Sequence, residues 1–460
     1  MIGNISILIC SFFFICVIYF YLLKVWPDID VLDLYIVFIL FHFGFYPFIR
    51  GLYFGKDNIW LDLGDSNPLV IGVVFGHVLL ILAVIKISYM HLFKNVREFL
   101  KIERLIQEFS CVNKLVLLLI YGILILFPIF SYYKYGIKTY IMPDDFKQIG
   151  KQLPYWFTSI RTVYPLLAFV VSLGLVASLL KSRGYYKYIW IIITVLFVPI
   201  VSIYGRRFFL GIIIVWAIFW CIEDRKEIFS MKYLKVGLGL ICAFFLFSNL
   251  FQAYRPIFES VGQIKLQNME NPFNAALNFK ATINNVQLRA GTWEFNFLVF
   301  DHQFTKPGMT TNGKIAWEGI KSAIPKLLWP GKQFMWTDDI LVALYHKDKR
   351  QIDIGKNLFG VGQLEIGYLS LIVVPLIIIM IIAMMGSLVK MTLQYPTFLW
   401  LFSGNILYFL LNIEENGNEI FFMLRNTCLI SIIFCGYLII NKIIMFHSLK
   451  FRKVSESIGK

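Results

Sequence analysis

The sequence predicts an all-α, multi-pass membrane protein with about eleven (ten to twelve) transmembrane helices and one large extracytoplasmic loop. Composition is the first observation: 58% of the 460 residues are hydrophobic and 15% are charged, whereas soluble domains carry about 25% charged residues. The second is a series of apolar runs of ~20 residues, the length an α-helix needs to cross a bilayer. The third is a long, more polar stretch that interrupts this series late in the chain.

Four regions follow from these runs: about eight spans over residues 1–252, the large loop over 253–361, about three spans over 362–441, and a basic cytoplasmic tail over 442–460. In chain order, the predicted spans are residues 2–23, 31–49, 68–87, 112–130, 163–180, 188–204, 208–222, 236–252, 363–388, 396–413 and 420–441. No basic residue precedes the first run, which is too long for a signal-peptide core, so we expect it to remain as a span.

The net charge of +15 gives the predicted orientation. On a soluble protein such a charge suggests nucleic acid, but in membrane proteins Lys and Arg mark the cytoplasmic loops. Alternate connections hold 20 basic residues on one side and 9 in the short connections on the other. We therefore expect the first set and the C-terminus in the cytoplasm, the large loop outside, a lipid bilayer as partner and no nucleic acid.

Several classes of site are absent from the sequence. The seven cysteines lie in or beside apolar runs without CxxC or CxxH spacing, which argues against a disulfide framework or a zinc site. Walker A, HExxH and GxSxG motifs are missing as well. Asp57, Asp62 and Asp65 form one loose acidic group, which leaves a metal-bound phospho-sugar as a less favoured alternative.

The large loop is expected to be folded. It holds 13 basic and 9 acidic residues together with many aromatic ones, whereas disordered segments are poor in aromatic residues. A structureless loop of this length is also uncommon, so we expect short helices packed down onto the bundle. Residues 312–328 alternate apolar and charged side chains at helical spacing, which predicts an interfacial amphipathic helix.

Arginines near the outer membrane surface are the first candidate site residues. Arg206 and Arg207 follow Tyr204-Gly205 between two spans with almost no connection, and Arg425 lies about one and a half turns inside the last span. Guanidinium groups at this depth are costly unless they snorkel or bind an anion. A phosphate clamp is the functional interpretation. The alternatives are an interfacial anchor for the pair, and for Arg425 an ion pair with Glu414, Glu415 or Glu419.

Two more arginines, Arg255 and Arg289, flank or lie within the large loop, where each alone is typical of a snorkelling or solvated residue. The loop also contains Ile324-Pro325-Lys326-Leu327-Leu328-Trp329-Pro330-Gly331-Lys332, followed by Asp338-Asp339. Two prolines exclude a continuous helix here, and Trp329 suits either an interfacial belt or stacking on a sugar. Lys326 and Lys332 add positive charge.

This layout resembles the Wzy-type oligosaccharide repeat-unit polymerases, which include O-antigen and enterobacterial common antigen polymerases. The resemblance covers the whole chain and is most specific in five places. These are Gly205-Arg206-Arg207 opening a span, Tyr254-Arg255 closing one, Arg289 with Trp293-Glu294, the Ile324-Pro325 to Lys332 run, and Arg425 after an acidic turn. Two departures stand out: Gln333 follows Lys332, and Gly362-Gln363 occupies a position where relatives often have Gly-Glu, so no catalytic acid is assigned there.

The resemblance implies a GT-C-like glycosyltransferase bundle in the bacterial cytoplasmic (inner) membrane, working on undecaprenyl-diphosphate-linked oligosaccharides. It transfers the growing glycan to the terminal hydroxyl of a new lipid-linked repeat, for O-antigen, capsule or lipopolysaccharide synthesis, beside a chain-length regulator and a flippase. No metal or other cofactor is expected, since arginines supply the positive charge. The implied catalytic residues are Glu294, Arg206, Arg207 and Arg425, with Asp338, Asp339 and His302 as further candidates for the general base. The implied substrate-binding residues are Arg255, Arg289, Lys326, Trp329, Lys332, Asp338 and Asp339.

Two other functions remain open at this point. An O-antigen ligase shares the topology and the outer arginines but uses lipid A core as acceptor. A flippase for lipid-linked oligosaccharides needs cavity-lining charges and inverted repeats, and we find no internal repeat.

Overall fold

A computed structural model of the chain describes residues 2–26, 28–52, 67–135, 155–202, 291–305, 310–325, 328–333, 335, 337–345, 356–411 and 416–458. The described residues form helices joined by turns, with a single isolated β-bridge between Asp30 and Lys101. They confirm a helical, multi-pass membrane protein.

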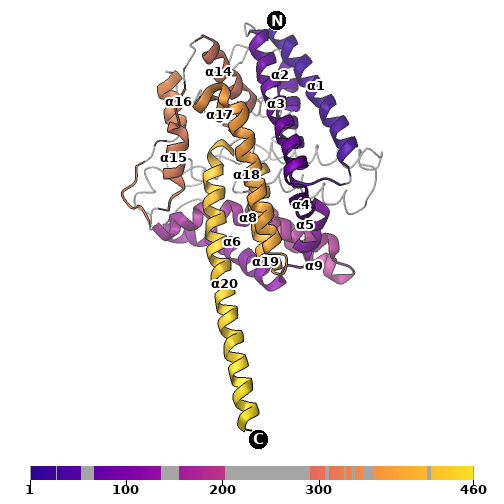
Figure 1. Ribbon diagram of the computed structural model, residues 1–460, viewed down its shortest axis with the longest axis vertical. Coiled ribbons are helices and arrows are strands. Elements are labelled where there is room, and N and C mark those ends of the chain that lie inside the picture. Colours follow the sequence, from indigo (N-terminus) through magenta and orange to yellow (C-terminus); the bar gives the residue numbers. More distant parts are fainter. Residues whose placement is uncertain are drawn as a thin grey trace, which may run out of the picture.

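The helices of the first half are α1 (Ile2–Val25), α2 (Val31–Leu52), α3 (Pro68–Leu92), α4 (Lys94–Arg97), η2 (Glu98–Leu100), α5 (Ile102–Ser110), α6 (Lys114–Tyr135), α8 (Tyr155–Lys181) and α9 (Tyr185–Ser202). The later ones are α14 (Gly291–Thr305), α15 (Lys314–Ala323), α16 (Thr337–Tyr345), α17 (Leu358–Ile366), η5 (Gly367–Leu369), α18 (Ser370–Met391), α19 (Pro396–Leu411) and α20 (Asn416–Ile458). Figure 1 shows α20 running down beside α18 and projecting beyond the rest of the bundle.

Five helical segments among the described residues are long and apolar enough to cross a membrane. They are Ile5–Val25, Val31–Ile49, Pro68–Leu92, Leu358–Met391 and Ile420–Ile444. A sixth arises if α5 and the start of α6, bent by 90° to each other, count as one span. The predicted spans at 208–222 and 236–252 lie outside the described residues, so the total of eleven stays a prediction.

Close contacts at glycines help to hold the spans together. A Cβ on Gly404 of α19 would lie 2.5 Å from Val170 Cγ2 of α8, so only glycine permits this approach. One turn earlier on α19, Trp400 Nε1 donates a hydrogen bond of 2.8 Å to the Val170 carbonyl. Small residues at helix contacts are typical of membrane proteins, where packing rather than the hydrophobic effect drives association.

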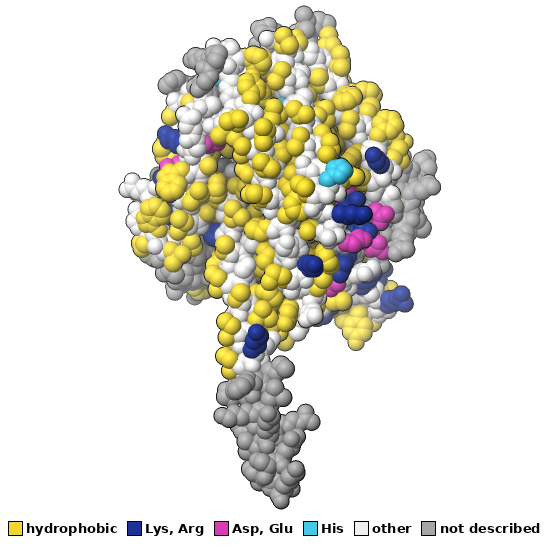
Figure 2. Space-filling model, viewed as in Figure 1, with side chains coloured by type: hydrophobic (Ala, Val, Ile, Leu, Met, Phe, Trp, Pro, Cys, Tyr) yellow, Lys and Arg dark blue, Asp and Glu magenta, His cyan; other side chains and the backbone are white. Residues whose placement is uncertain are grey.

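The outward faces of the spans are strongly apolar. Exposed side chains on α1 include Ile9 and Phe20, and those on α20 include Ile432 and Ile433. Figure 2 shows hydrophobic side chains over most of one face, with the charged ones gathered mainly toward one side of the lower half. This arrangement is what a lipid-facing surface requires, because lipid tails offer no hydrogen bonds.

Helix α2 begins with a capping box. Asp30, the residue before the helix, accepts a hydrogen bond of 2.9 Å from the Asp33 amide, and Asp33 Oδ2 accepts one of 3.2 Å from the Asp30 amide. Such reciprocal bonds satisfy two amides that the first helical turn leaves without partners. The capping box therefore fixes where the chain turns from α1 into α2.

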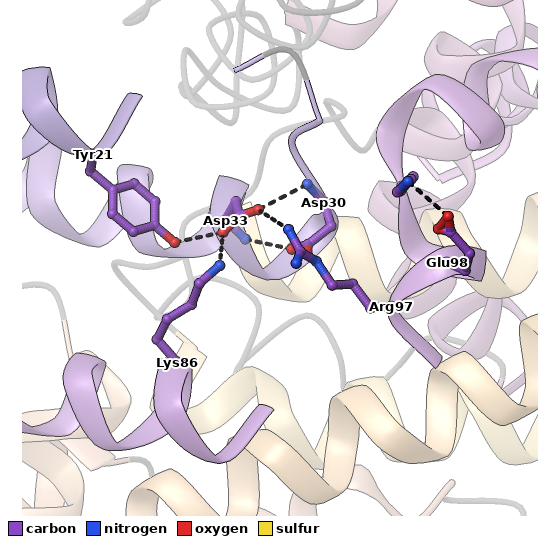
Figure 3. A network of polar contacts seen from close by, with 7 residues as sticks. Tyr21, Asp30, Asp33, Lys86, Arg97 and Glu98 are labelled. Atoms are coloured by element: carbon purple, nitrogen blue, oxygen red, sulfur yellow. Dashed lines mark hydrogen bonds and ion pairs between the residues drawn. The ribbon is translucent and has the colours of Figure 1, made fainter. Parts of the chain in front are cut away.

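The two carboxylates of the capping box are fully buried and bind cations from α3 and α4 (Figure 3). Lys86 donates to Asp33, which also accepts from the Tyr21 hydroxyl at 2.5 Å. Arg97 Nε lies 2.7 Å from Asp30 Oδ2. Burying carboxylates is tolerated only when charges and hydrogen bonds compensate them. These contacts, hereafter the α2 clasp, tie α1 and α2 to α3 and α4.

The N-terminal end of the chain and α14, α16 and α17 lie at the upper end of the bundle in Figure 1, whereas α4, α5 and the C-terminus lie toward the lower end. Which end faces the cytoplasm stays a prediction from charge.

A cysteine at Thr310, just before α15, should react with an impermeant thiol reagent in intact cells without an outer barrier. Labelling of Thr310→Cys only after lysis would reverse the orientation; Ser182→Cys, after α8, should show the opposite behaviour.

Candidate functional site

Helix α15 belongs to the predicted large loop, and a carboxylate from α17 caps its N-terminus. Glu365 Oε1 accepts hydrogen bonds from the Ile315 and Ala316 amides at 2.6 and 3.1 Å. Gly313, which precedes the helix, has a φ of 83°, a conformation that favours glycine. A negative charge here suits the partial positive charge of a helix N-terminus. Glu365 thus positions α15.

Lys332 caps the other end of α15. The helix stops at Ala323, earlier than the predicted 328, because Ile324 precedes a proline and adopts an extended conformation. Lys332 Nζ donates hydrogen bonds to the carbonyls of Lys321 at 2.7 Å and Ser322 at 2.9 Å, and also to that of Ile324. All three N–H donors of this predicted substrate ligand are directed at backbone, so binding a phosphate would require breaking one of these bonds.

Glu318 fastens the following turn to α15. It pairs with Lys321 at 2.5 Å and accepts a hydrogen bond of 2.8 Å from the Met335 amide. Burial alone would raise the pKa of Glu318, but these two partners outweigh it and hold the pKa below its usual value. The turn that carries Trp329, whose side chain is 41% exposed, is therefore held in a defined shape.

Helix α15 packs against the start of the last span. A Cβ on Gly319 would lie 2.4 Å from Phe421 Cδ2 of α20. One turn earlier on α20, the Gly417 amide donates a hydrogen bond of 3.3 Å to the Lys356 carbonyl before α17. Residues four apart share a face of a helix, so Gly417, Phe421 and Arg425 form one stripe. We call these three residues the α20 stripe. Its first two positions face the folded part of the large loop. Arg425 follows one turn after Phe421, the residue that contacts α15.

Arg425 is half-buried on the α20 stripe, and its guanidinium contacts two neighbouring side chains. Its Nε and Nη2 donate to Asn426 Oδ1 at 3.1 and 2.8 Å, and its Cζ lies 5.0 Å from the centre of the Phe422 ring. Neighbouring polar groups on α20 are also fixed, since Asn405 of α19 donates to Thr427 at 2.9 Å. The planar guanidinium matches phosphate oxygens in shape, but binding a phosphate through its Nε and Nη2 edge would require breaking these bonds to Asn426.

Glu294 lies in the core rather than on this surface. Helix α14 packs on α3, where Trp293 stacks on Phe297 and lies against Phe75, at centroid distances of 5.6 and 6.0 Å. Glu294 is 1% exposed. The side chain of the predicted general base is therefore buried, whereas that of Asp339 on α16 is partly exposed.

A chain of polar side chains inside the bundle escaped the sequence analysis. Gln303 of α14 donates to the Gln363 carbonyl at 2.9 Å, and Gln363 Nε2 returns a bond of 2.7 Å to Gln303. Ser370 donates to Gln363 Oε1 at 2.8 Å and lies 3.1 Å from His77 Nε2 of α3. The chain therefore joins α3, α14, α17 and α18. His77, a polar residue within an apolar run, is the sequence feature that could have pointed to this chain of side chains.

The remaining predicted site residues are not brought together by the described part of the chain. Arg206, Arg207, Arg255, Arg289 and Lys326 lie outside the described residues, as do Asp57, Asp62, Asp65, Glu414 and Glu415. Asp338 is on α16, but its side chain is outside what the structure describes, as is that of Glu419 on α20. Within the described residues, no group of three or more His, Cys, Asp or Glu side chains is arranged to hold a metal ion.

The Gly319 contact leads to a testable prediction. Gly319→Val should push α15 away from Phe421, because overpacking a close contact costs about 1–3 kcal/mol. We expect faster limited proteolysis in the 324–335 turn while the spans stay intact. Gly331→Ala is the matched control, since a Cβ there meets nothing within 4 Å. Equal cleavage rates in both variants would contradict the proposed docking of α15.

Comparison of the chain with protein-family models, with curated proteins and with solved structures found no match.

Proposed function

We propose that the chain is a polymerase of undecaprenyl-diphosphate-linked oligosaccharide repeat units in surface polysaccharide synthesis. The growing glycan is transferred to the terminal hydroxyl of one new lipid-linked repeat. The bond between the anomeric carbon and the diphosphate oxygen breaks, the acceptor oxygen forms the new glycosidic bond, and undecaprenyl diphosphate leaves. A carboxylate or imidazole takes the proton of the acceptor hydroxyl.

One observation carries this proposal furthest: the α20 stripe brings an intramembrane arginine beside a folded part of the large loop. The Gly319–Phe421 contact lies one helical turn from Arg425. A reaction on a lipid diphosphate needs a cation at the membrane surface and a folded lid for the sugars in the same place. The contact between α15 and α20 supports both requirements together.

Arg425 is the described residue best placed to bind the diphosphate. Charge develops on the leaving diphosphate in the transition state, and a guanidinium stabilises it. Asp339, which is partly exposed, is favoured over the core residue Glu294 as the proton acceptor. Trp329, exposed on the turn after α15, supplies an aromatic face on which a sugar ring can stack.

The test is the length of the glycans in cells that lack the protein. A polymerase leaves single repeats attached to their acceptor, and restoring the gene returns the full ladder. If no repeat reaches the outer surface, the protein is a flippase instead. If full-length polymer accumulates on the lipid carrier but never reaches lipid A core, the protein is a ligase.

A further inference from the structure

The lower end of the bundle contains a close helix contact that gathers basic side chains. Gly386 of α18 packs against the segment between α3 and α5: a Cβ on Gly386 would lie 1.9 Å from Val96 Cγ1 and 3.4 Å from Leu100 Cδ1. Since only glycine allows this approach, the chain brings Phe99, on η2, beside Lys390, one turn further along α18.

Two cations from distant parts of the sequence converge on the Phe99 ring. Arg104 Cζ of α5 lies 4.7 Å from the ring centre, and Lys390 Nζ of α18 lies 5.7 Å from it. The ring attracts a cation through its quadrupole. Two like charges gathered on one ring nevertheless repel each other, so the arrangement favours an anion between or beside them.

Two of the nearby acids already have cationic partners, although Glu98 also lies within electrostatic reach of Arg104. Glu98, next to the ring residue, pairs with Lys101 at 2.8 Å, and Asp30 is held in the α2 clasp by Arg97. Within the part of the chain that the structure describes, Arg104 and Lys390 take part in no ion pair. Lys390 is exposed and Arg104 is partly exposed, so both can reach a ligand.

The site also lies at the level of a membrane surface. Lys390 is the second-last residue of the span Leu358–Met391, and α3 ends nearby at Leu92. Lipid phosphates occupy this level, and basic residues near it attract anionic lipids. The partly exposed Phe99 ring is suited to contact the glycerol and upper acyl chain of such a lipid.

We propose that Arg104 and Lys390, arranged around Phe99, bind the phosphate of an anionic phospholipid headgroup. The site lies at the other end of the span Leu358–Met391 from Glu365, which caps α15, and does not depend on the polymerase proposal. The lipid fastens α5 to α18 by neutralising their two cations. Its chemistry requires a phosphodiester with a net negative charge, as in phosphatidylglycerol, and it discriminates against zwitterionic lipids.

The experiment measures lipid binding to the full-length purified protein. Native mass spectrometry with added phosphatidylglycerol, and separately phosphatidylcholine, reports the affinity of each lipid. Arg104→Gln with Lys390→Gln should weaken phosphatidylglycerol binding about thirtyfold, from two lost headgroup contacts. Phosphatidylcholine binding should stay the same. Lys94→Gln, an exposed cation on α4 without a ring contact, is the matched control and should change little.

Three outcomes would overturn the proposal. The first is equal loss in Lys94→Gln and the double variant, which would indicate a general surface effect. The second is displacement of phosphatidylglycerol by millimolar inorganic phosphate, which would make free phosphate the ligand. The third is failure of the charge-exchanged variant Arg104→Lys with Lys390→Arg to bind phosphatidylglycerol, because this variant keeps both cations. Thermal unfolding in phosphatidylcholine checks that each variant is folded.

Discussion

Replacing Arg425 with lysine should reduce polymer formation about as severely as replacing it with alanine. Lysine keeps the charge but offers a single ammonium in place of the planar fork that binds two phosphate oxygens at once. Losing one charge-assisted contact to a transition state in a water-poor site costs on the order of 3 kcal/mol, or about a hundredfold in rate. The readout is the polymer ladder in cells at matched protein levels.

The Arg425→Lys variant separates binding from anchoring. A residue that only snorkels to the membrane surface works equally well as lysine, so full-length ladders from this variant would remove the catalytic role of Arg425. Lys442→Ala is the matched control, because Lys442 is a basic residue of the same helix near the opposite end of the span Ile420–Ile444. We expect Arg206→Lys to behave like Arg425→Lys. If both give normal ladders, the site must be rebuilt around Arg255, Arg289 and the turn at Trp329.

Structural features that depend on residues close together in the sequence could be predicted well. The apolar runs gave the positions of the described spans because a helix in lipid satisfies its own backbone. The amphipathic spacing after residue 312 predicted α15, and Pro325 explains why this helix ends at Ala323.

Contacts between distant segments could not be predicted. The sequence suggested Lys332 as a substrate-binding residue, but only the fold brings its ammonium to the three carbonyls at the end of α15. Glu365 lies about fifty residues from the amides that it caps. Trp293-Glu294 belongs to a motif of the predicted large loop, and packing on α3 buries both side chains. In each case the residue type shows which interactions the side chain can make, and tertiary packing decides which partner it makes them with.

The α2 clasp is another contact between distant segments that the sequence did not predict. The largest effect of a substitution on stability is expected there. Arg97→Gln removes the cation beside Asp30 and leaves a fully buried carboxylate without its ion pair. Breaking a buried pair from one side costs about 3–5 kcal/mol. We expect a strongly lowered thermal unfolding temperature in detergent. The exposed pair of Glu98 and Lys101 is the control, and Lys101→Gln should change the unfolding temperature little.

The response to pH follows from Asp30. Burial, together with the charge of Asp33, raises the pKa of Asp30 from 3.8 to about 6. The folded state therefore binds more protons than the unfolded state between these values, and this group's contribution to stability falls as pH rises through that window. Arg97 opposes the shift, so in Arg97→Gln the pKa rises further and the loss of stability should be larger at pH 8 than at pH 5.

A double variant decides whether the pair or its arginine alone matters. Asp30→Asn keeps an oxygen that can still accept the Asp33 amide at the start of α2, because asparagine is also a good N-terminal cap. Adding it to Arg97→Gln removes the uncompensated charge, and the double variant should unfold at a higher temperature than Arg97→Gln alone. It should also lose the extra sensitivity to pH 8. Strictly additive effects of the two substitutions would show that Asp30 and Arg97 do not act as a pair. The clasp would then rest on Lys86 and Asp33.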